Sequence, residues 1–148
     1  MIAYLHAETL KRSAGRSIVA SSAYISGERE TNEYTGLTHD YRAKSGIVHS
    51  EVLLPSNAPQ SFHSAEKLWS SLECAEKSPQ AKLGLSIVAA IPNEIPKEQW
   101  IPLAKEFCQH FVDQGCCVQF AIHNPVARND RGIPINAQGF PAKSPEEY

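Results

Sequence analysis

The sequence predicts an α+β domain in which helices pack against a sheet. Its 148 residues are enough for one domain with a hydrophobic core, and 42% hydrophobic with 20% charged residues is an ordinary globular composition. Segments with strand-like alternation and segments with helix-like spacing follow one another, so each helix is expected to cover one face of a sheet. We expect one domain over residues 1–148, in which residues 124–148 form a turn-rich loop or a disordered tail, because turn dipeptides replace any periodicity there.

Charge and cysteine content narrow the class of protein. The net charge of -2 argues against a basic nucleic-acid-binding surface over the whole chain. The N-terminal third is nevertheless locally basic, with Lys11, Arg12, Arg16, Arg29, Arg42 and Lys44. The four cysteines form no C-x-x-C pair, so we expect reduced thiols and a cytoplasmic protein. No apolar run reaches the roughly 18–20 residues of a membrane span and no leader is visible, so no membrane insertion is expected.

The first half of the chain is expected to hold two strands and a short helix. Residues 1–9 alternate as a strand does, and a basic turn follows over residues 11–16. Ser17 is a suitable N-cap for a helix of small residues that ends at Gly27. The polar residues 27–45 predict a loop with at most a short extended piece. Its Tyr34 and Tyr41 are either lids on the core or base-stacking surfaces.

The second half predicts alternating strands and helices. Residues 47–54 are β-branched and apolar and end at a proline, and residues 83–91 predict a buried strand. Apolar residues at helical spacing predict helices near residues 62–77 and 97–114. Residues 116–123 then predict a fourth strand.

Tyr24 lies at the end of the short helix and is the candidate for chemistry. Small neighbours allow close approach of another molecule, and Arg12 and Arg16 place positive charge near the phenol, as a tyrosine that meets a phosphodiester requires. Taken alone, these residues favour a half-buried packing tyrosine with a wet hydroxyl.

Metal ligands are sparse in the sequence. His123 closes the last predicted strand, where an imidazole would stand at a sheet end, although a single histidine there is more often a surface residue. His49 and Glu51, two residues apart on one strand face, form a weaker candidate pair. No H-x-H or H-x-x-x-H occurs, so the sequence alone draws no complete metal site.

Four segments carry a family resemblance. They are K-R-S-A-G-R-S-I-V-A-S-S-A-Y-I-S-G-E-R, Y-R-A-K-S-G-I-V-H-S-E-V-L-L-P-S-N-A-P, A-A-I-P-N-E and V-Q-F-A-I-H, in order up to residue 123. Together they resemble the N-terminal relaxase domain of the MobA/MobL family of plasmid mobilization proteins. The resemblance implies a mostly antiparallel sheet flanked by helices, as in HUH relaxases. It also implies a metal-dependent nickase whose tyrosine stays attached to the 5′ phosphate of the nicked strand.

The resemblance assigns roles to particular residues and partners. It implies that Tyr24 is the nucleophile, that His123 matches the first of three histidine ligands of a Mg or Mn ion, and that Arg12 or Arg16 holds flanking phosphates. The implied partners are single-stranded DNA of an origin of transfer, relaxosome accessory proteins and the conjugative coupling machinery.

The sequence departs from the family pattern at two places. The other two ligands belong to an N-P-H-A-H segment, whereas residues 124–128 read N-P-V-A-R, and Leu85-Ser86 stand where Arg-Glu is frequent. We therefore expect a partial relaxase domain, incomplete at its C-terminus and inactive or nearly so, since each lost ligand weakens metal binding. The alternatives are a non-catalytic remnant that binds single-stranded DNA, and a poorly folded gene fragment.

Overall fold

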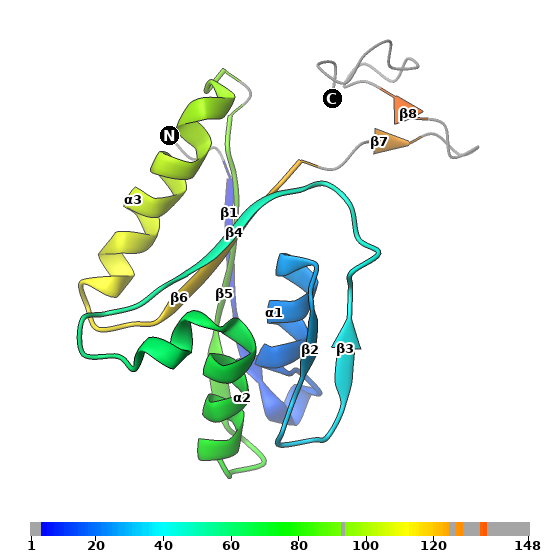
Figure 1. Ribbon diagram of the computed structural model, residues 1–148, viewed down its shortest axis with the longest axis vertical. Helices are drawn as coiled ribbons and strands as arrows, with labels where there is room; N and C mark the ends of the chain where they lie inside the picture. The colour runs from blue at the N-terminus through cyan, green and yellow to red at the C-terminus, as the bar shows by residue number, and fades with distance from the viewer. Residues whose placement is uncertain (1–3, 93, 125–126, 129–133, 136–148) are drawn as a thin grey trace.

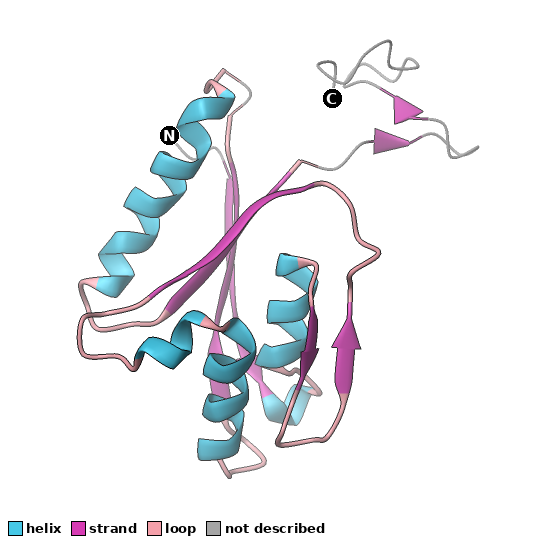
Figure 2. Ribbon diagram, in the orientation of Figure 1, coloured by secondary structure: helices cyan, strands magenta, loops and turns pink. Residues whose placement is uncertain are grey.

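The structure is a computed structural model that describes residues 4–92, 94–124, 127–128 and 134–135 (Figure 1). It has three helices and eight strands in the described residues, joined by short 3-10 turns (Figure 2). The elements are, in chain order, β1 (Tyr4–Lys11), α1 (Ile18–Ser26), β2 (Arg29–Thr31), β3 (Thr38–Asp40), β4 (Ile47–Leu53), α2 (Ala65–Ala75), β5 (Lys82–Ala90), α3 (Trp100–Val112), β6 (Val118–His123), β7 (Ala127–Arg128) and β8 (Pro134–Ile135).

Every strand pair in the described residues is antiparallel, which confirms the predicted fold class. β1 pairs with β5, β2 with β3, β4 with β6, and β7 with β8. The prediction of one sheet is refined, because these pairs do not join into a continuous sheet within the described residues. Figure 1 shows α3 beside the crossing β4–β6 pair, while α1 lies between the β1–β5 pair and the β2–β3 hairpin.

The short helix α1 forms as its sequence predicts. Ser17 is its N-cap and accepts a hydrogen bond from the Ala20 N–H at 3.2 Å. Gly27 ends it with φ +68°, a left-handed conformation that glycine adopts without steric cost. Ile47 packs against Gly27, since the Ile47 Cδ1 occupies the space that a side chain at residue 27 would need.

The segment predicted to be a loop over residues 27–45 contains a hairpin instead. β2 and β3 are three residues each, too short for alternation to reveal them. Contacts from α2 hold the hairpin, because Glu66 accepts from the Thr31 N–H at 2.7 Å and Ser70 accepts from the Glu33 N–H at 2.9 Å. The prediction was wrong here because these partners are more than 30 residues away.

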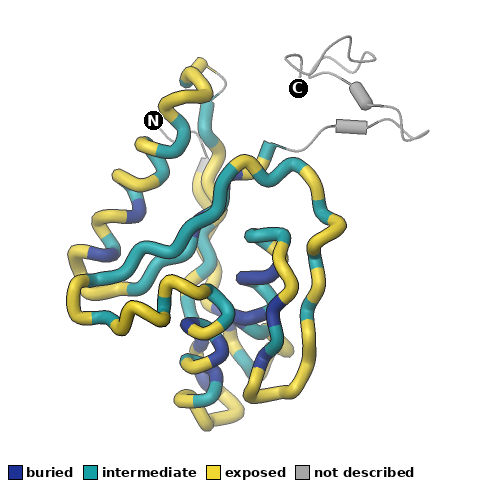
Figure 3. The backbone as a smooth tube through the Cα atoms, viewed as in Figure 1, coloured by how far each residue is buried: buried dark blue, intermediate teal, exposed yellow. Residues whose placement is uncertain are grey.

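Two buried clusters hold the fold together. The first joins β1, α1 and β5 through Leu10, Ile18, Ala81 and Leu83, against which Trp69 and Leu72 of α2 pack. The second joins α3 to β6 through Cys108, Phe120 and Ile122. Figure 3 shows buried residues concentrated around α1 and α2.

The prediction that the β5 strand is buried was wrong over most of its length. Leu83 is buried, but Leu85 and Val88 are exposed. The helices cover the Leu83 end alone, and β1 is the strand that pairs with β5 in the described residues. An apolar run therefore does not by itself report burial on both faces of a strand.

The remaining predictions about chain organisation have mixed outcomes. The two-residue strands β7 and β8 pair within the segment expected to be a loop or tail, and the rest of residues 124–148 beyond Asn124 lies outside the described residues. All four cysteines are free thiols. None of the helices in the described ranges is long and apolar enough to span a membrane.

Candidate functional site

A groove of about 600 Å³ runs along α1 and gathers most of the predicted site residues. The helix lines it with Ala20, Ser21 and Tyr24, the hairpin lines it with Tyr34 and His39, and β5 lines it with Ser86 and Val88. Arg12, Arg16 and Tyr41 also border it. The small residues of α1 thus leave open space beside the tyrosine, as the sequence predicts.

Tyr24 is 51% exposed and its ring is held on two sides. The Tyr41 ring meets it edge-on, with centroids 5.3 Å apart and planes at 86°. The Lys44 Nζ lies 3.3 Å from the Tyr24 ring centroid and donates to the Tyr24 backbone carbonyl at 3.1 Å. Lys44 therefore places a positive charge beside the candidate nucleophile and fixes its orientation.

The N-terminus of α1 is held by a buried carboxylate from α2. Glu73 accepts from the Ser17 hydroxyl at 2.6 Å and from the Val19 N–H at 3.1 Å. A negative charge at this end of a helix also interacts favourably with the helix dipole. Buried Asn32, on the hairpin turn, donates to the Ser17 hydroxyl at 3.3 Å. The helix that carries Tyr24 is thus anchored from both α2 and the hairpin.

The two candidate DNA-binding arginines differ in availability. The Arg12 guanidinium donates to the backbone carbonyls of Glu73 at 2.9 Å and Ser78 at 3.1 Å, and to that of Glu76, so it caps the end of α2. Arg16 pairs with Glu8 at 2.5 Å on the surface, where both side chains are more than 40% exposed. Since a surface ion pair is worth little, Arg16 is free to exchange Glu8 for a phosphate. DNA binding by either residue stays a prediction.

His123 contacts α1 near its C-terminal end, opposite the end that Glu73 holds. Its Nε2 is 2.7 Å from the Ile25 carbonyl oxygen, next to Tyr24. A carbonyl oxygen only accepts hydrogen bonds, so Nε2 is the donor in this contact, and in the tautomer that has its proton on Nε2 the lone pair lies on Nδ1. His123 is exposed at the end of β6, as predicted. Its role as a metal ligand stays a prediction, and no group of three or more His, Cys, Asp or Glu forms in the described part of the chain.

A buried carboxylate lies behind α1, on the side away from the groove. Glu30 of β2 is 3% exposed and accepts from the hydroxyls of Ser22 at 2.8 Å and Ser26 at 3.4 Å. Burial raises its pKa to about 7, and the nearby Glu66 and Glu28 carboxylates add to the rise. Its Oε1 has no hydrogen-bond partner among the described residues, and neither has Nε2 of His39, which stands directly opposite on β3.

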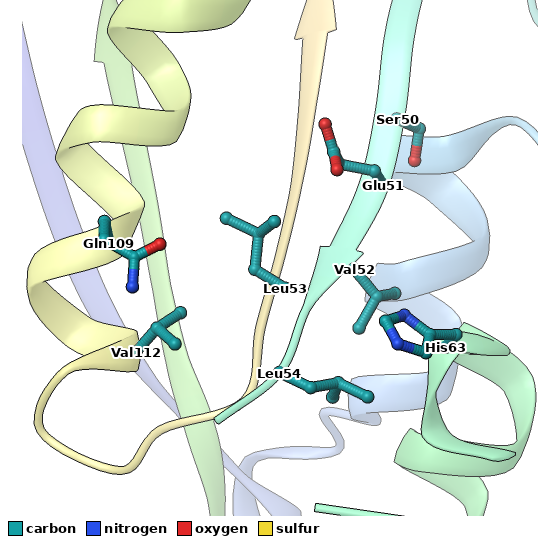
Figure 4. Close-up of a pocket in the computed structure, with 8 residues that line it drawn as sticks. All are labelled: Ser50, Glu51, Val52, Leu53, Leu54, His63, Gln109 and Val112. Atoms are coloured by element: carbon teal, nitrogen blue, oxygen red, sulfur yellow. The ribbon is translucent and has the colours of Figure 1, made fainter. Parts of the chain in front are cut away.

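A second groove lies between β4 and α3 and contains none of the residues predicted to act as nucleophile, DNA contact or metal ligand, apart from Glu51 of the weaker candidate pair (Figure 4). Leu53 of β4 and Val112 of α3 give it an apolar lining, with Gln109 beside them. Glu51 also lines it, but its Oε1 lies 2.8 Å from the His49 Nε2 and 3.6 Å from the Lys105 Nζ. The weaker candidate pair thus lies together on one face, as predicted; the two side chains contact each other, and Glu51 also pairs with Lys105.

Sequence reasoning missed three residues of the Tyr24 site. Lys44 counts among the basic residues but has no spacing relation to Tyr24, and Glu73 and Glu30 resemble any helix or loop carboxylate. Their contacts with α1 span up to 56 residues, so no local pattern reveals them.

Comparison with known proteins places this arrangement in context. The sequence matches the MobA/MobL family over residues 16–132. It is 33% identical over 148 residues to the mobilization protein MobL of Acidithiobacillus ferridurans, covering 99% of this chain and 36% of MobL. It is 31% identical over 158 residues to the conjugal transfer protein TraA of Agrobacterium fabrum, covering 96% of this chain and 14% of TraA. The chain thus spans a minor part of the length of these relatives.

The fold has a solved counterpart. A structure described as the molecular basis of vancomycin resistance transfer in Staphylococcus aureus superposes with a TM-score of 0.79 and 26% identity, covering 89% of this chain and 74% of that chain. The family match includes α1 with Tyr24, the hairpin and β6 with His123. The chain belongs to the MobA/MobL family.

Proposed function

We propose that this chain provides the relaxase domain of a conjugative mobilization protein and that Tyr24 attacks a phosphodiester of single-stranded DNA at an origin of transfer. The observation that carries the proposal is the exposed Tyr24 phenol in a groove bordered by Arg16, with Lys44 against its ring and His123 at the end of its helix. The family match and the named mobilization and conjugal transfer relatives support it.

The proposed step is a transesterification. The Tyr24 hydroxyl loses its proton to solvent as its oxygen bonds to phosphorus, the bond from phosphorus to the 3′ oxygen breaks, and that oxygen takes up a proton. The products are a 5′-phosphotyrosine and a free 3′-hydroxyl, with no oxidation or reduction. Arg16 and Lys44 would offset the negative charge that gathers around the phosphate.

A divalent ion, Mg or Mn, is part of the proposal as a group that would polarise a non-bridging phosphate oxygen. His123 would hold it through Nδ1, and the described residues do not complete a ligand set around it. Because residues 124–128 read N-P-V-A-R and contain no histidine of the implied N-P-H-A-H segment, we expect these 148 residues to nick DNA weakly or not at all.

A second candidate function is binding of single-stranded DNA without cleavage. It is favoured by the same groove, in which tyrosines and an exposed arginine lie together, whereas His123 is the one histidine that contacts the end of the Tyr24 helix in the described residues, through the Ile25 carbonyl. On either candidate the partners would be origin DNA, relaxosome accessory proteins and the coupling machinery, in the cytoplasm.

The test is a covalent-adduct assay. The 148-residue chain is incubated with Mn²⁺ and a labelled single-stranded origin oligonucleotide, and the adduct that survives denaturing electrophoresis is mapped by mass spectrometry. Any adduct is expected at Tyr24 and is expected to be absent from Tyr24→Phe, which keeps the ring and removes the nucleophile. An adduct that persists in this variant refutes the role of Tyr24.

The same assay separates the two candidates. Robust nicking that is lost in Tyr24→Phe establishes the catalytic role and overturns the expected weakness of this chain. Salt-sensitive binding with no adduct, unchanged by Tyr24→Phe, supports the non-catalytic function instead.

A further inference from the structure

We propose that Tyr34, fixed in place by Arg12, is a stacking platform for an unpaired nucleobase in the groove that also contains Tyr24. The ligand class rests on the proposed function, which brings single-stranded DNA to this groove. The two loop tyrosines are equivalent in the sequence, and their contacts now assign them different roles.

The Tyr34 ring is 42% exposed and has a neighbour that holds it. The Arg12 Cζ lies 4.0 Å from its centroid, so the guanidinium lies against the ring. The Tyr34 N–H donates to the Oδ1 of buried Asn32 at 2.9 Å, which fixes the backbone of the turn. An exposed aromatic ring that is already immobilised loses little conformational entropy when a ligand stacks on it.

Arg12 is itself held by several contacts, so its guanidinium is not free to move toward a DNA phosphate. Its guanidinium donates to the carbonyls of Glu73 and Ser78 and lies 3.9 Å from the Glu73 carboxylate, with 13% of its side chain exposed. These contacts favour a supporting role for Arg12 behind the ring over direct contact with the DNA backbone. The exposed charge nearby is that of Arg16, which also borders the groove.

The chemistry of the groove fits a nucleotide strand. Arg16 offers a charge for a phosphate, and the exposed apolar side chains of Leu37 and Val88 also line the groove. A groove that combines a cation with aromatic and apolar surfaces suits single-stranded DNA, which presents phosphates and unpaired bases together. Tyr41 is the less available ring, because it is only partly exposed and packs against Tyr24.

The experiment is a double-mutant cycle between Tyr34 and the DNA bases. The affinity of the chain is measured for an origin oligonucleotide and for a series of the same oligonucleotide in which each member lacks one base. The protein variants are Tyr34→Leu, Tyr34→Phe and Tyr34→Trp, with folding checked by circular dichroism.

Loss of the ring is expected to weaken binding of the intact oligonucleotide by about 5- to 150-fold. Tyr34→Phe is expected to bind within about twofold of the parent, and Tyr34→Trp at least as tightly, because stacking needs the ring and not the hydroxyl. One base-free oligonucleotide is expected to bind the parent and Tyr34→Leu equally, which identifies the stacked base.

Three outcomes overturn the inference: no single-stranded DNA binding by the parent chain, no loss in Tyr34→Leu, or an equal loss with every base-free oligonucleotide. The adduct at Tyr24 is scored separately in the same samples. Absence of the adduct therefore counts against the proposed nicking and leaves the stacking result standing on its own.

Discussion

Replacing Glu30 by Gln is expected to remove a pH-dependent weakness from the fold. Glu30 is buried behind the Tyr24 helix and its pKa is raised to about 7 from 4.5. The folded protein therefore binds this proton more tightly than the unfolded chain does. Since the native state holds more protons between pH 4.5 and 7, the free energy of unfolding decreases as pH rises through that range.

The magnitude follows from the shift. A tenfold change in proton affinity corresponds to about 1.4 kcal/mol, so ionisation of Glu30 costs the folded state about 3 kcal/mol above pH 7. The stability that depends on protonated Glu30 is fully present below pH 4.5 and is lost by about pH 8. Hydrogen bonds with Arg42 lower the pKa of Asp40 to about 2. Asp40 therefore changes charge below this pH range and does not affect how the free energy of unfolding varies with pH within it.

The assay is urea unfolding of the parent and the Glu30→Gln variant at intervals from pH 5 to 8. The difference in free energy of unfolding between the two is expected to shift by about 3 kcal/mol in favour of the variant as pH rises. Glu106→Gln, at an exposed position on α3, is the matched control and is expected to show no such shift. Parallel pH profiles for the parent and the Glu30→Gln variant would refute the argument.

Two further changes test the anchors of α1, each by urea unfolding. Gly27→Ala is expected to cost about 1 kcal/mol more than Gly15→Ala, since both glycines have positive φ but only at residue 27 must the terminal methyl of the flexible Ile47 side chain move to make room; equal losses would contradict the packing argument. Glu73→Ala is expected to cost about 3 kcal/mol because it leaves the Ser17 hydroxyl and the buried Val19 N–H without their acceptor and removes the carboxylate 3.9 Å from the Arg12 guanidinium, whereas exposed Glu76→Ala should stay within about 0.5 kcal/mol. A small loss in Glu73→Ala would show that α1 does not need this anchor.

Local signals were enough to predict the helix that carries Tyr24. Ser17 and Gly27 mark its ends through backbone chemistry that depends on the nearest few residues, and the structure has the helix within those limits. The strands of seven or more residues were likewise predicted, and those of their ends that can be compared within the described residues are shifted by up to two residues.

Features that depend on distant contacts were missed. The β2–β3 hairpin owes its backbone partners to Glu66 and Ser70 of α2, and the exposure of Leu85 depends on what lies beside β5. The residues of the candidate site follow the same rule: those near Tyr24 in sequence were predicted, and those that reach it through distant contacts were missed. Arg16 is near Tyr24 in sequence and was predicted, whereas Lys44 reaches the Tyr24 ring across a hairpin that the sequence did not reveal.

The position of Tyr24 is therefore a property of the whole fold. Glu73 holds the start of its helix, Glu30 holds the face behind it, and His123 holds the carbonyl that follows the tyrosine. These three anchors come from α2, β2 and β6, elements far apart in the chain. A packing tyrosine would need none of them, because burial of its ring would suffice, yet the Tyr24 ring is half exposed and still fixed by Lys44 and its neighbours. An exposed phenol on a helix that is anchored at both ends and behind is consistent with the role proposed for Tyr24, since attack on phosphorus depends on orientation.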